Sequence, residues 1–247
     1  MSLAQSVDSI RGMAKPHFIE LPGCGPIPIL YEDRSVLAVD KPCGWMLAPV
    51  SWRNTSRNLQ AAIESSIAAR DFWARSRAIK FLRHLHRLDA DTSGVLLFAK
   101  SAGVIKIYSD LFESRQMEKT YLAVASGHAP DVKWACRLKL APDPKRVGRM
   151  KVDARHGKAA ETRFRLLKTH GHYSLIEVWP LTGRTHQIRV HLAEAGLPIV
   201  GDELYGTRAN RLPLGLRAVW LAYIDPFTRM RVEIRAPTGK FLKDFGF

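Results

Sequence analysis

The stretch that decides the fold runs from His86 to Gly94 and reads His-Arg-Leu-Asp-Ala-Asp-Thr-Ser-Gly. It places the acidic residue Asp89 close to Arg87, in a segment whose Asp, Thr, Ser and Gly residues favour a turn. A second stretch, about a hundred residues further along, runs from Gly183 to Arg189 and reads Gly-Arg-Thr-His-Gln-Ile-Arg. It places another arginine at the opening of a predicted helix. We interpret the two stretches as the halves of one active site.

One alternative for the first stretch is a calcium loop. Asp, Asp, Ser and Gly fill positions one, three, five and six of an EF-hand loop that starts at Asp89. Position twelve of such a loop is a bidentate Glu, whereas here it is Lys100. The sequence therefore excludes an EF-hand.

A second alternative is a phosphohydrolase, because the segment from Asp89 is similar to the Asp-x-Asp-x-Thr motif of haloacid-dehalogenase-type phosphatases. In that class the acid ends an apolar strand, whereas Asp89 follows Phe-Leu-Arg-His-Leu-His-Arg-Leu. The later acidic pair that would bind magnesium has no counterpart in the sequence. This remains the weaker alternative, which a requirement for magnesium would favour.

The chain resembles the RluA-type family of RNA pseudouridine synthases, whose signature is similar to His-Arg-Leu-Asp-x-x-Thr-Ser-Gly. All seven fixed residues are present between His86 and Gly94, and the likeness spans roughly residues 29–237. Four further motifs follow the family's order: Lys41-Pro42-x-Gly44, Lys119-x-Tyr121, Gly157-Lys158-x-Ala160-x-Thr162, and the run from Gly183 to Leu192 that continues over Pro198-Ile-Val-Gly-Asp-x-x-Tyr205-Gly206.

This resemblance implies an isomerase that converts uridine in RNA to pseudouridine, without a cofactor or a metal. Asp89 would be the catalytic carboxylate, as a nucleophile or as a base on the sugar. Burial alone would raise the pKa of a carboxyl group, so a cation is needed to keep Asp89 charged. By motif match that cation is Arg189, which can pair bidentately with a carboxylate. Tyr121 would lie against the uracil face and assist proton transfer.

The resemblance also implies residues that hold the RNA. A uridine in folded RNA must leave its stack to reach Asp89, at a cost of a few kcal/mol. Arg87 matches the family's arginine that fills the vacated space. The other substrate-binding candidates are His86, Thr92, Arg184, His186 and Gln187. Four histidines could suggest a metal, but their spacings do not give the i, i+4 pair expected on a helix, and we expect His86 and His186 to brace loops.

The charge of the chain points to the same partner. Its 38 Lys and Arg residues against 23 Asp and Glu residues give a formal net charge of +15, which favours a polyanion. Residues 137–158 form a basic loop, which we interpret as a finger that grips RNA through Lys145, Arg146 and Arg149, or else as a solvated hairpin tip. No apolar run approaches the roughly 18 to 20 residues that cross a bilayer, so we expect no membrane association.

The patterning predicts one α+β domain around a large mixed or mostly antiparallel sheet, flanked by helices and loops. Predicted strands cover residues 29–31, 35–39, 95–99, 119–125, 162–167, 173–179, 218–223 and 229–234. Predicted helices begin at caps on Ser56 or Asn58, on Ser101 and on Thr185, the last ending at Gly196. Residues 1–26 are expected to be an N-terminal arm without the S4-type module that many relatives carry, and residues 27–247 the catalytic domain.

Other features bound the interpretation less sharply. The three cysteines, Cys24, Cys43 and Cys136, form no Cys-x-x-Cys pair and fit a reducing cytoplasm. Trp45 and Trp52 stand where relatives have other residues, and either packing or RNA stacking would explain them. We expect a monomer with no obligate protein partner, acting on ribosomal or transfer RNA. A catalytically silent RNA-binding protein of the same fold is the alternative.

Overall fold

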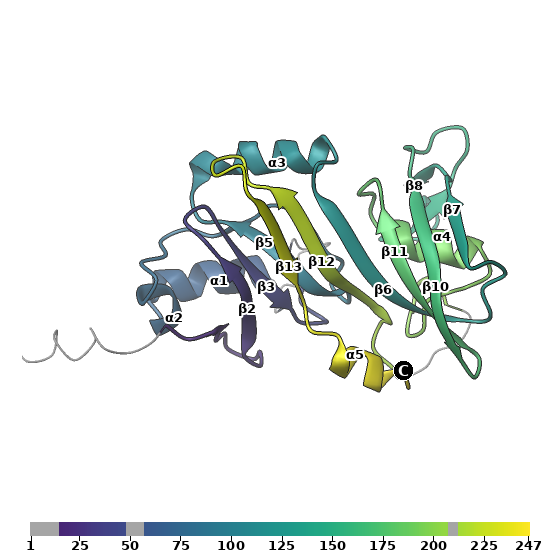
Figure 1. Ribbon diagram of the computed structural model, residues 1–247, viewed down its shortest axis with the longest axis horizontal. Helices are drawn as coiled ribbons and strands as arrows, with labels where there is room; N and C mark the ends of the chain where they lie inside the picture. Colours follow the sequence, from purple (N-terminus) through teal and green to yellow (C-terminus); the bar gives the residue numbers. More distant parts are fainter. Residues whose placement is uncertain (1–14, 48–56, 207–211) are drawn as a thin grey trace, which may run out of the picture.

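A computed structural model describes residues 15–47, 57–206 and 212–247. Trp52 and Ser56 lie outside these residues, as does most of the predicted N-terminal arm. Within them, eleven strands form one mixed sheet, as the sequence predicted (Figure 1). Nine follow the order β1 (Phe18–Ile19), β2 (Ile27–Glu32), β3 (Val36–Lys41), β5 (Ser93–Ala99), β12 (Leu216–Ile224), β6 (Glu118–Ser126), β11 (Tyr173–Pro180), β10 (Thr162–His170) and β7 (Lys133–Cys136).

Two strands lie off this path, and a small hairpin stands apart. β4 (Arg83–His84) pairs with β5, and β13 (Arg231–Arg235) pairs with β12. All pairs are antiparallel except β5 with β12. The predicted basic loop is in part a hairpin, because β8 (Leu140–Pro142) and β9 (Met150–Val152) form a separate two-stranded sheet.

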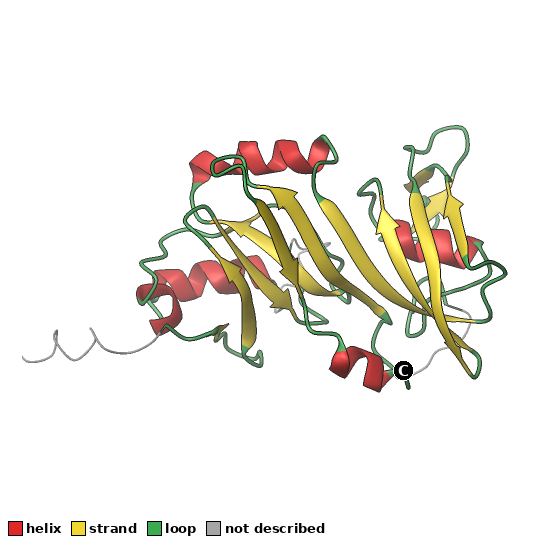
Figure 2. Ribbon diagram, in the orientation of Figure 1, coloured by secondary structure: helices red, strands yellow, loops and turns green. Residues whose placement is uncertain are grey.

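Alternation along the strands divides the core between the two faces of the sheet. On one face, Leu96 and Phe98 of β5 pack in a cluster with residues of α1 (Leu59–Ala68), α2 (Phe72–Arg75) and α4 (Gln187–Glu194). On the other face, Val95 and Leu97 pack with α3 (Ile105–Glu113), and α5 (Gly239–Asp244) covers a smaller cluster (Figure 2). None of the helices in the described ranges is both long and apolar enough to cross a membrane.

The structure differs from two local predictions and agrees with two others. The expected arm already contributes β1, which pairs with β2 and buries Ile19 completely. Ser101 makes no capping hydrogen bond, because a short 3-10 turn (Ala102–Val104) precedes α3. Asn58, by contrast, caps α1 as predicted, since its side chain accepts a hydrogen bond from the N–H of Ala61. Trp45 is buried in the core, in agreement with the packing interpretation.

The sheet forks next to Tyr121. β6 and β11 are paired from Ser126 opposite Tyr173 to Tyr121 opposite Val178. Beyond that position the start of β6 pairs only with β12, and the end of β11 pairs only with β10. The two halves of the sheet therefore separate at Tyr121, and Figure 1 shows the strands diverging there.

The glycine of the first motif allows the one parallel pairing. Gly94 lies opposite Ala218 of β12 and has a φ of +114°, a conformation that side chains rarely adopt. A Cβ atom at Gly94 would lie 2.0 Å from the carbonyl oxygen of Ala218. Only glycine lets the two backbones approach in this way, so this part of the motif serves packing.

Candidate active site

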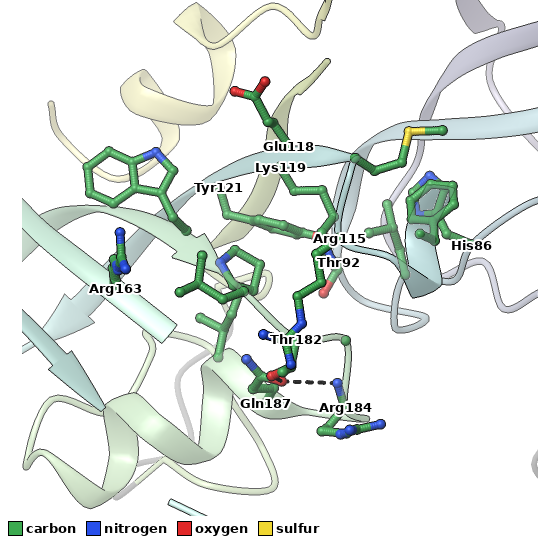
Figure 3. A pocket seen from close by; sticks show the side chains of 18 of the residues that line it. His86, Thr92, Arg115, Glu118, Lys119, Tyr121, Arg163, Thr182, Arg184 and Gln187 are labelled. Carbon is green, nitrogen blue, oxygen red and sulfur yellow. Dashed lines mark hydrogen bonds between the residues drawn. The ribbon is translucent and has the colours of Figure 1, made fainter. Parts of the chain in front are cut away.

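A cleft of about 1490 Å³ opens at the fork and is lined from both halves of the sheet. The three predicted catalytic residues, Asp89, Tyr121 and Arg189, all line it. The cleft also contains six of the predicted substrate-binding residues, namely His86, Arg87, Thr92, Arg184, His186 and Gln187. Figure 3 shows Tyr121 and Lys119 between Arg163 on one side of the view and His86 on the other.

Asp89 sits on a tight turn that the first family-like motif holds in place. The N–H of Thr92 donates to the carbonyl of Asp89 at 3.1 Å. The next carbonyl, that of Ala90, accepts from Lys41 Nζ at 2.7 Å and from the N–H of Gly44 at 2.9 Å. Lys41 is fully buried, and burial lowers the pKa of its ammonium group to about 8. The Lys-Pro-x-Gly segment thus fixes the backbone beside the carboxylate, a role that the sequence did not assign.

Arg189 connects Asp89 to a second acid. Its Nη1 donates to Asp89 Oδ2 at 3.3 Å, while Nε and Nη2 each donate to Asp202 at 2.8 Å. Arg189 can pair bidentately with a carboxylate, and its bidentate partner is Asp202, whereas Asp89 receives a single longer contact. This leaves the outer side of the Asp89 carboxylate, whose side chain is 23% exposed, facing the cleft.

The Arg189–Asp202 pair is buried, with side chains 4% and 0% exposed. Burial disfavours the charged form of both groups. Their mutual hydrogen bonds outweigh it, and the N–H groups of Leu204 and Tyr205 add two more to Asp202 at 3.0 Å. The pKa of Asp202 is lowered and the pKa of Arg189 is raised, so both stay ionised. Arg189 is a fixed positive charge beside Asp89.

Tyr121 occupies the last position of β6 that pairs with β11, and it is buried. Burial raises the pKa of its phenol above the ordinary value, and the negative charge of Asp89 raises it further. The phenol therefore stays protonated at neutral pH. It can present a flat apolar ring and an O–H donor to a bound base.

His186 faces Asp89 with one nitrogen and Tyr205 with the other. Its Nε2 lies 3.9 Å from Asp89 Oδ2, and its Nδ1 lies 2.9 Å from the Tyr205 hydroxyl. That hydroxyl already accepts the N–H of Met150 at 2.7 Å, so its own proton is available for His186 Nδ1. We assign the ring proton to Nε2 on this basis, where it points toward Asp89. Burial lowers the pKa of His186, although the charge of Asp89 opposes the shift.

The start of α4 differs from its prediction. The N-cap is His186 and not Thr185, and His186 has a φ of +54°, in the left-handed region that non-glycine residues seldom occupy. Gln187 replaces a conventional cap. Its amide oxygen accepts from the hydroxyl of Thr182 and from the N–H of Arg184 (Figure 3). Its amide nitrogen donates to the carbonyl of Glu161 and to the hydroxyl of Thr162, at the start of β10. Gln187 holds this loop and has no free hydrogen-bonding position for a substrate.

Of the other predicted residues, some stabilise the loops of the cleft and others are exposed cations. His86 accepts the N–H of Leu97 at 3.1 Å and stacks on Phe112, and burial lowers its pKa to about 3. It braces the loop, as expected for this residue. Thr92 is buried beside the turn, whereas Arg87 and Arg184 are exposed on the cleft wall.

The three cations of the basic hairpin that were predicted to contact RNA, Lys145, Arg146 and Arg149, do not line the cleft. Lys145 and Arg146 are exposed at its tip. The guanidinium carbon of Arg149 lies 5.1 Å from the ring centroid of Tyr205, and that of Arg189 lies 5.3 Å from the same centroid. Tyr205 therefore joins the hairpin to Arg189. Asp202 and Tyr205 were part of a recognised motif, but nothing in the sequence indicated these contacts.

The described residues contain no group of three metal-ligating side chains. The cleft of the forked sheet combines a carboxylate held by an arginine with a buried tyrosine, which are the three residues that the resemblance to pseudouridine synthases singled out. The family model described as RNA pseudouridylate synthase matches residues 35–194. The chain belongs to this family, in agreement with the RluA-type signature.

Individual relatives agree with this assignment. The chain is 34% identical over 189 residues to the ribosomal large subunit pseudouridine synthase D of Borreliella burgdorferi, covering 73% of this chain and 55% of that protein. It is 32% identical over 227 residues to the uncharacterized RNA pseudouridine synthase YhcT of Bacillus subtilis, covering 91% and 72%. Among solved structures, human RNA pseudouridylate synthase domain containing 1 superposes with a TM-score of 0.67 at 27% identity, covering 85% of this chain and 83% of that one. The chain spans only 31%, 49% and 55% of the length of three curated relatives that it matches.

Proposed function

We propose that this protein isomerises uridine in RNA to pseudouridine, with Asp89 as the catalytic carboxylate. The observation that carries the proposal is the contact between Arg189 and Asp89 in the cleft beside Tyr121. In the reaction the bond from N1 of uracil to the sugar C1′ breaks, the base turns, and C5 bonds to C1′. N1 gains a hydrogen and C5 loses one, so no electrons or groups are exchanged with an outside reactant.

Arg189 supports this chemistry by keeping Asp89 ionised. Because Asp202 holds two of the guanidinium nitrogens, Arg189 stays in place while Asp89 changes its bonding to the sugar. Both roles of Asp89 are compatible with this geometry: a nucleophile on C1′, or a base that takes a sugar proton.

Tyr121 supports the step at the base. Its raised pKa keeps the O–H proton in place at neutral pH, and its ring offers a stacking surface that is worth about 1–3 kcal/mol for a flipped base. We propose that its hydroxyl assists the proton transfer between C5 and N1.

RNA binding would come from exposed cations around the cleft. Arg87 projects from the wall next to Asp89, where it would fill the space of the flipped uridine, and Lys145 and Arg146 would contact phosphates from the hairpin tip. We propose ribosomal or transfer RNA as the substrate. The Borreliella relative is by name a ribosomal large subunit enzyme, which favours the former.

We further propose that the protein acts as a monomer in the cytoplasm, with residues 27–247 as its catalytic domain. One chain supplies Asp89, Tyr121 and Arg189 to the site, so a partner subunit is not needed to complete it. Its free cysteines are compatible with a reducing compartment.

The test is release of tritium from RNA labelled at C5 of uridine, measured without metal ions and separately on ribosomal and transfer RNA. We expect release from one fraction by the wild type and none by Asp89→Asn, with RNA affinity retained. Asp131→Asn, at an exposed position outside the cleft, is the matched control and should behave as wild type. Tritium release by Asp89→Asn would show that Asp89 is not the catalytic carboxylate. If the wild type binds RNA but releases tritium from neither the ribosomal nor the transfer fraction, a catalytically silent RNA-binding protein would be favoured.

A further inference from the structure

The outer wall of the cleft carries aromatic and basic side chains to which the reaction assigns no role. In the antiparallel register Ala135, Arg163 and Trp179 lie side by side on β7, β10 and β11, and Lys133, Arg165 and Glu177 form a second row two residues away. Residues two apart on a strand share a face, so both rows lie on one face of the sheet. Five of these six side chains line the same cleft as Asp89, Glu177 being the exception.

Trp179 is held in place from within the protein. The guanidinium carbon of Arg165 lies 5.6 Å from the centroid of the Trp179 ring. Arg165 is itself paired with Glu177, whose Oε2 accepts its Nε at 2.9 Å. This chain of contacts orders the indole before any ligand binds, while the half-exposed ring still reaches the cleft. A pre-ordered aromatic surface loses little entropy when a second ring stacks on it.

The charges on this wall are unequally compensated. Glu177 neutralises Arg165, and Glu161 pairs with Arg137 at 3.1 Å. Arg163 and Lys133 are exposed and form no ion pair with any residue in the described ranges. Two uncompensated cations therefore share a sheet face with the indole: Arg163 is directly opposite Trp179, and Lys133 lies two strands away, opposite Arg165. The protein as a whole already has a net charge of +15. This combination is complementary to a nucleotide, which offers a flat base and an anionic phosphate.

We infer that this wall is a second nucleotide-binding site, in which a base next to the target uridine stacks on Trp179 while Arg163 and Lys133 bind the adjoining phosphates. The inference rests on the proposed function, because drawing one uridine toward Asp89 unstacks its neighbours and leaves them without a stacking partner. Stacking on an indole is tolerant of base identity. The site therefore selects for unpaired RNA beside the target, not for a particular letter.

The first test replaces the stacking surface. Trp179→Leu is expected to raise the Kd for the RNA fraction that supports tritium release, and the KM, about tenfold, whereas Trp179→Phe keeps most of the affinity. The single-turnover rate at saturating RNA should stay within about twofold of wild type, because stacking on this wall does not touch the reacting atoms. Unchanged Kd and KM in Trp179→Leu would overturn the inference.

The second test addresses the phosphates. Arg163→Gln should lower the slope of log Kd against log salt by about 0.7 to 0.9, the value of one phosphate contact. Lys168→Gln, an exposed cation of the same strand outside the cleft, should leave this slope unchanged. An equal loss in both variants would indicate a diffuse effect of net charge and contradict a site.

Ultraviolet cross-linking gives a readout that leaves the side chains of the wall unchanged and does not depend on turnover. With Asp89→Asn and a photoreactive analogue incorporated beside the target uridine, the cross-linked peptide should contain Trp179. A cross-link there would support the site even if isomerisation failed, and so separates this inference from the proposed function. Cross-links only to other parts of the cleft would contradict it. So would a competition experiment in which an acidic protein, and not RNA, protects Trp179.

Discussion

The hydroxyl of Tyr205 lies 2.9 Å from Nδ1 of His186 and 2.7 Å from the backbone nitrogen of Met150. One hydroxyl thus connects strand β9 of the basic hairpin to the imidazole that faces Asp89. Since Arg149 and Arg189 both lie over the ring of the same tyrosine, Tyr205 is a structural link between the hairpin and the carboxylate of Asp89.

Removal of that hydroxyl should impair turnover without impairing binding. In Tyr205→Phe the His186 ring loses the partner that holds its proton on Nε2, and we expect kcat to fall about fivefold to tenfold, the equivalent of one hydrogen bond. KM should change by less than about twofold, because Tyr205 makes no contact with RNA in the proposed site. Tyr173→Phe, on β11 away from the cleft, is the control. A rise in KM with an unchanged kcat would instead indicate that Tyr205 only anchors the hairpin.

The pair of Asp202 with Arg189 should dominate the stability of the site. Asp202→Asn leaves a buried guanidinium without its bidentate partner, and we expect the free energy of unfolding to fall by about 3–5 kcal/mol. Urea denaturation checks this, beside Asp131→Asn as the exposed control. A loss below about 1 kcal/mol would show that Asp89 or water replaces Asp202 as the partner of Arg189.

The protein should lose stability as the pH falls below about 6.5, and His86 should account for part of that loss. Its folded-state pKa of about 3 lies below the ordinary value near 6.5, so the unfolded chain binds the proton first. The contribution of His86 is therefore complete above pH 6.5 and is lost between pH 6.5 and 3. His86→Gln should flatten the stability profile over this range, whereas His17→Gln, at an exposed site, should not. Parallel profiles for wild type and His86→Gln would contradict the assignment.

The tip of the basic hairpin should contribute to affinity and not to chemistry. The double variant Lys145→Gln, Arg146→Gln removes two exposed cations and is expected to lower the salt slope of RNA binding by about 1.4 to 1.8. The single-turnover rate at saturating RNA should not change, since neither residue lines the cleft. Lys80→Gln provides an exposed control outside the cleft. An unchanged salt slope would make the hairpin tip a bystander.

Most strands of the sheet could be predicted because they are apolar runs, as in β5 and β6, or alternate apolar with charged residues, as in β13. Asp89 and Arg189 could be paired because both lie in motifs. The short elements could not: β7 has four residues, α2 four and β1 two, too few to show a periodicity. Thr185 has the chemistry of an N-cap, but the left-handed backbone at His186 and the amide of Gln187 take over that function. The bidentate partner of Arg189 depends on where the chain returns after α4, which no local pattern encodes.

The close approach of Gly94 to Ala218 shows that the nine-residue signature carries two separable kinds of information. Its last residue, Gly94, is needed for the close approach of β5 to β12. A chain with this backbone arrangement needs the glycine whether or not it is catalytically active. Its fourth residue, Asp89, is the carboxylate on which the proposed reaction depends. A relative that retained Thr-Ser-Gly but lacked the acid at the position of Asp89 would still match the signature at most positions. It would nevertheless be unable to carry out the reaction. Similarity along this stretch is therefore evidence for the fold in the first place. Whether a relative shares the activity has to be judged from the residue at the position of Asp89.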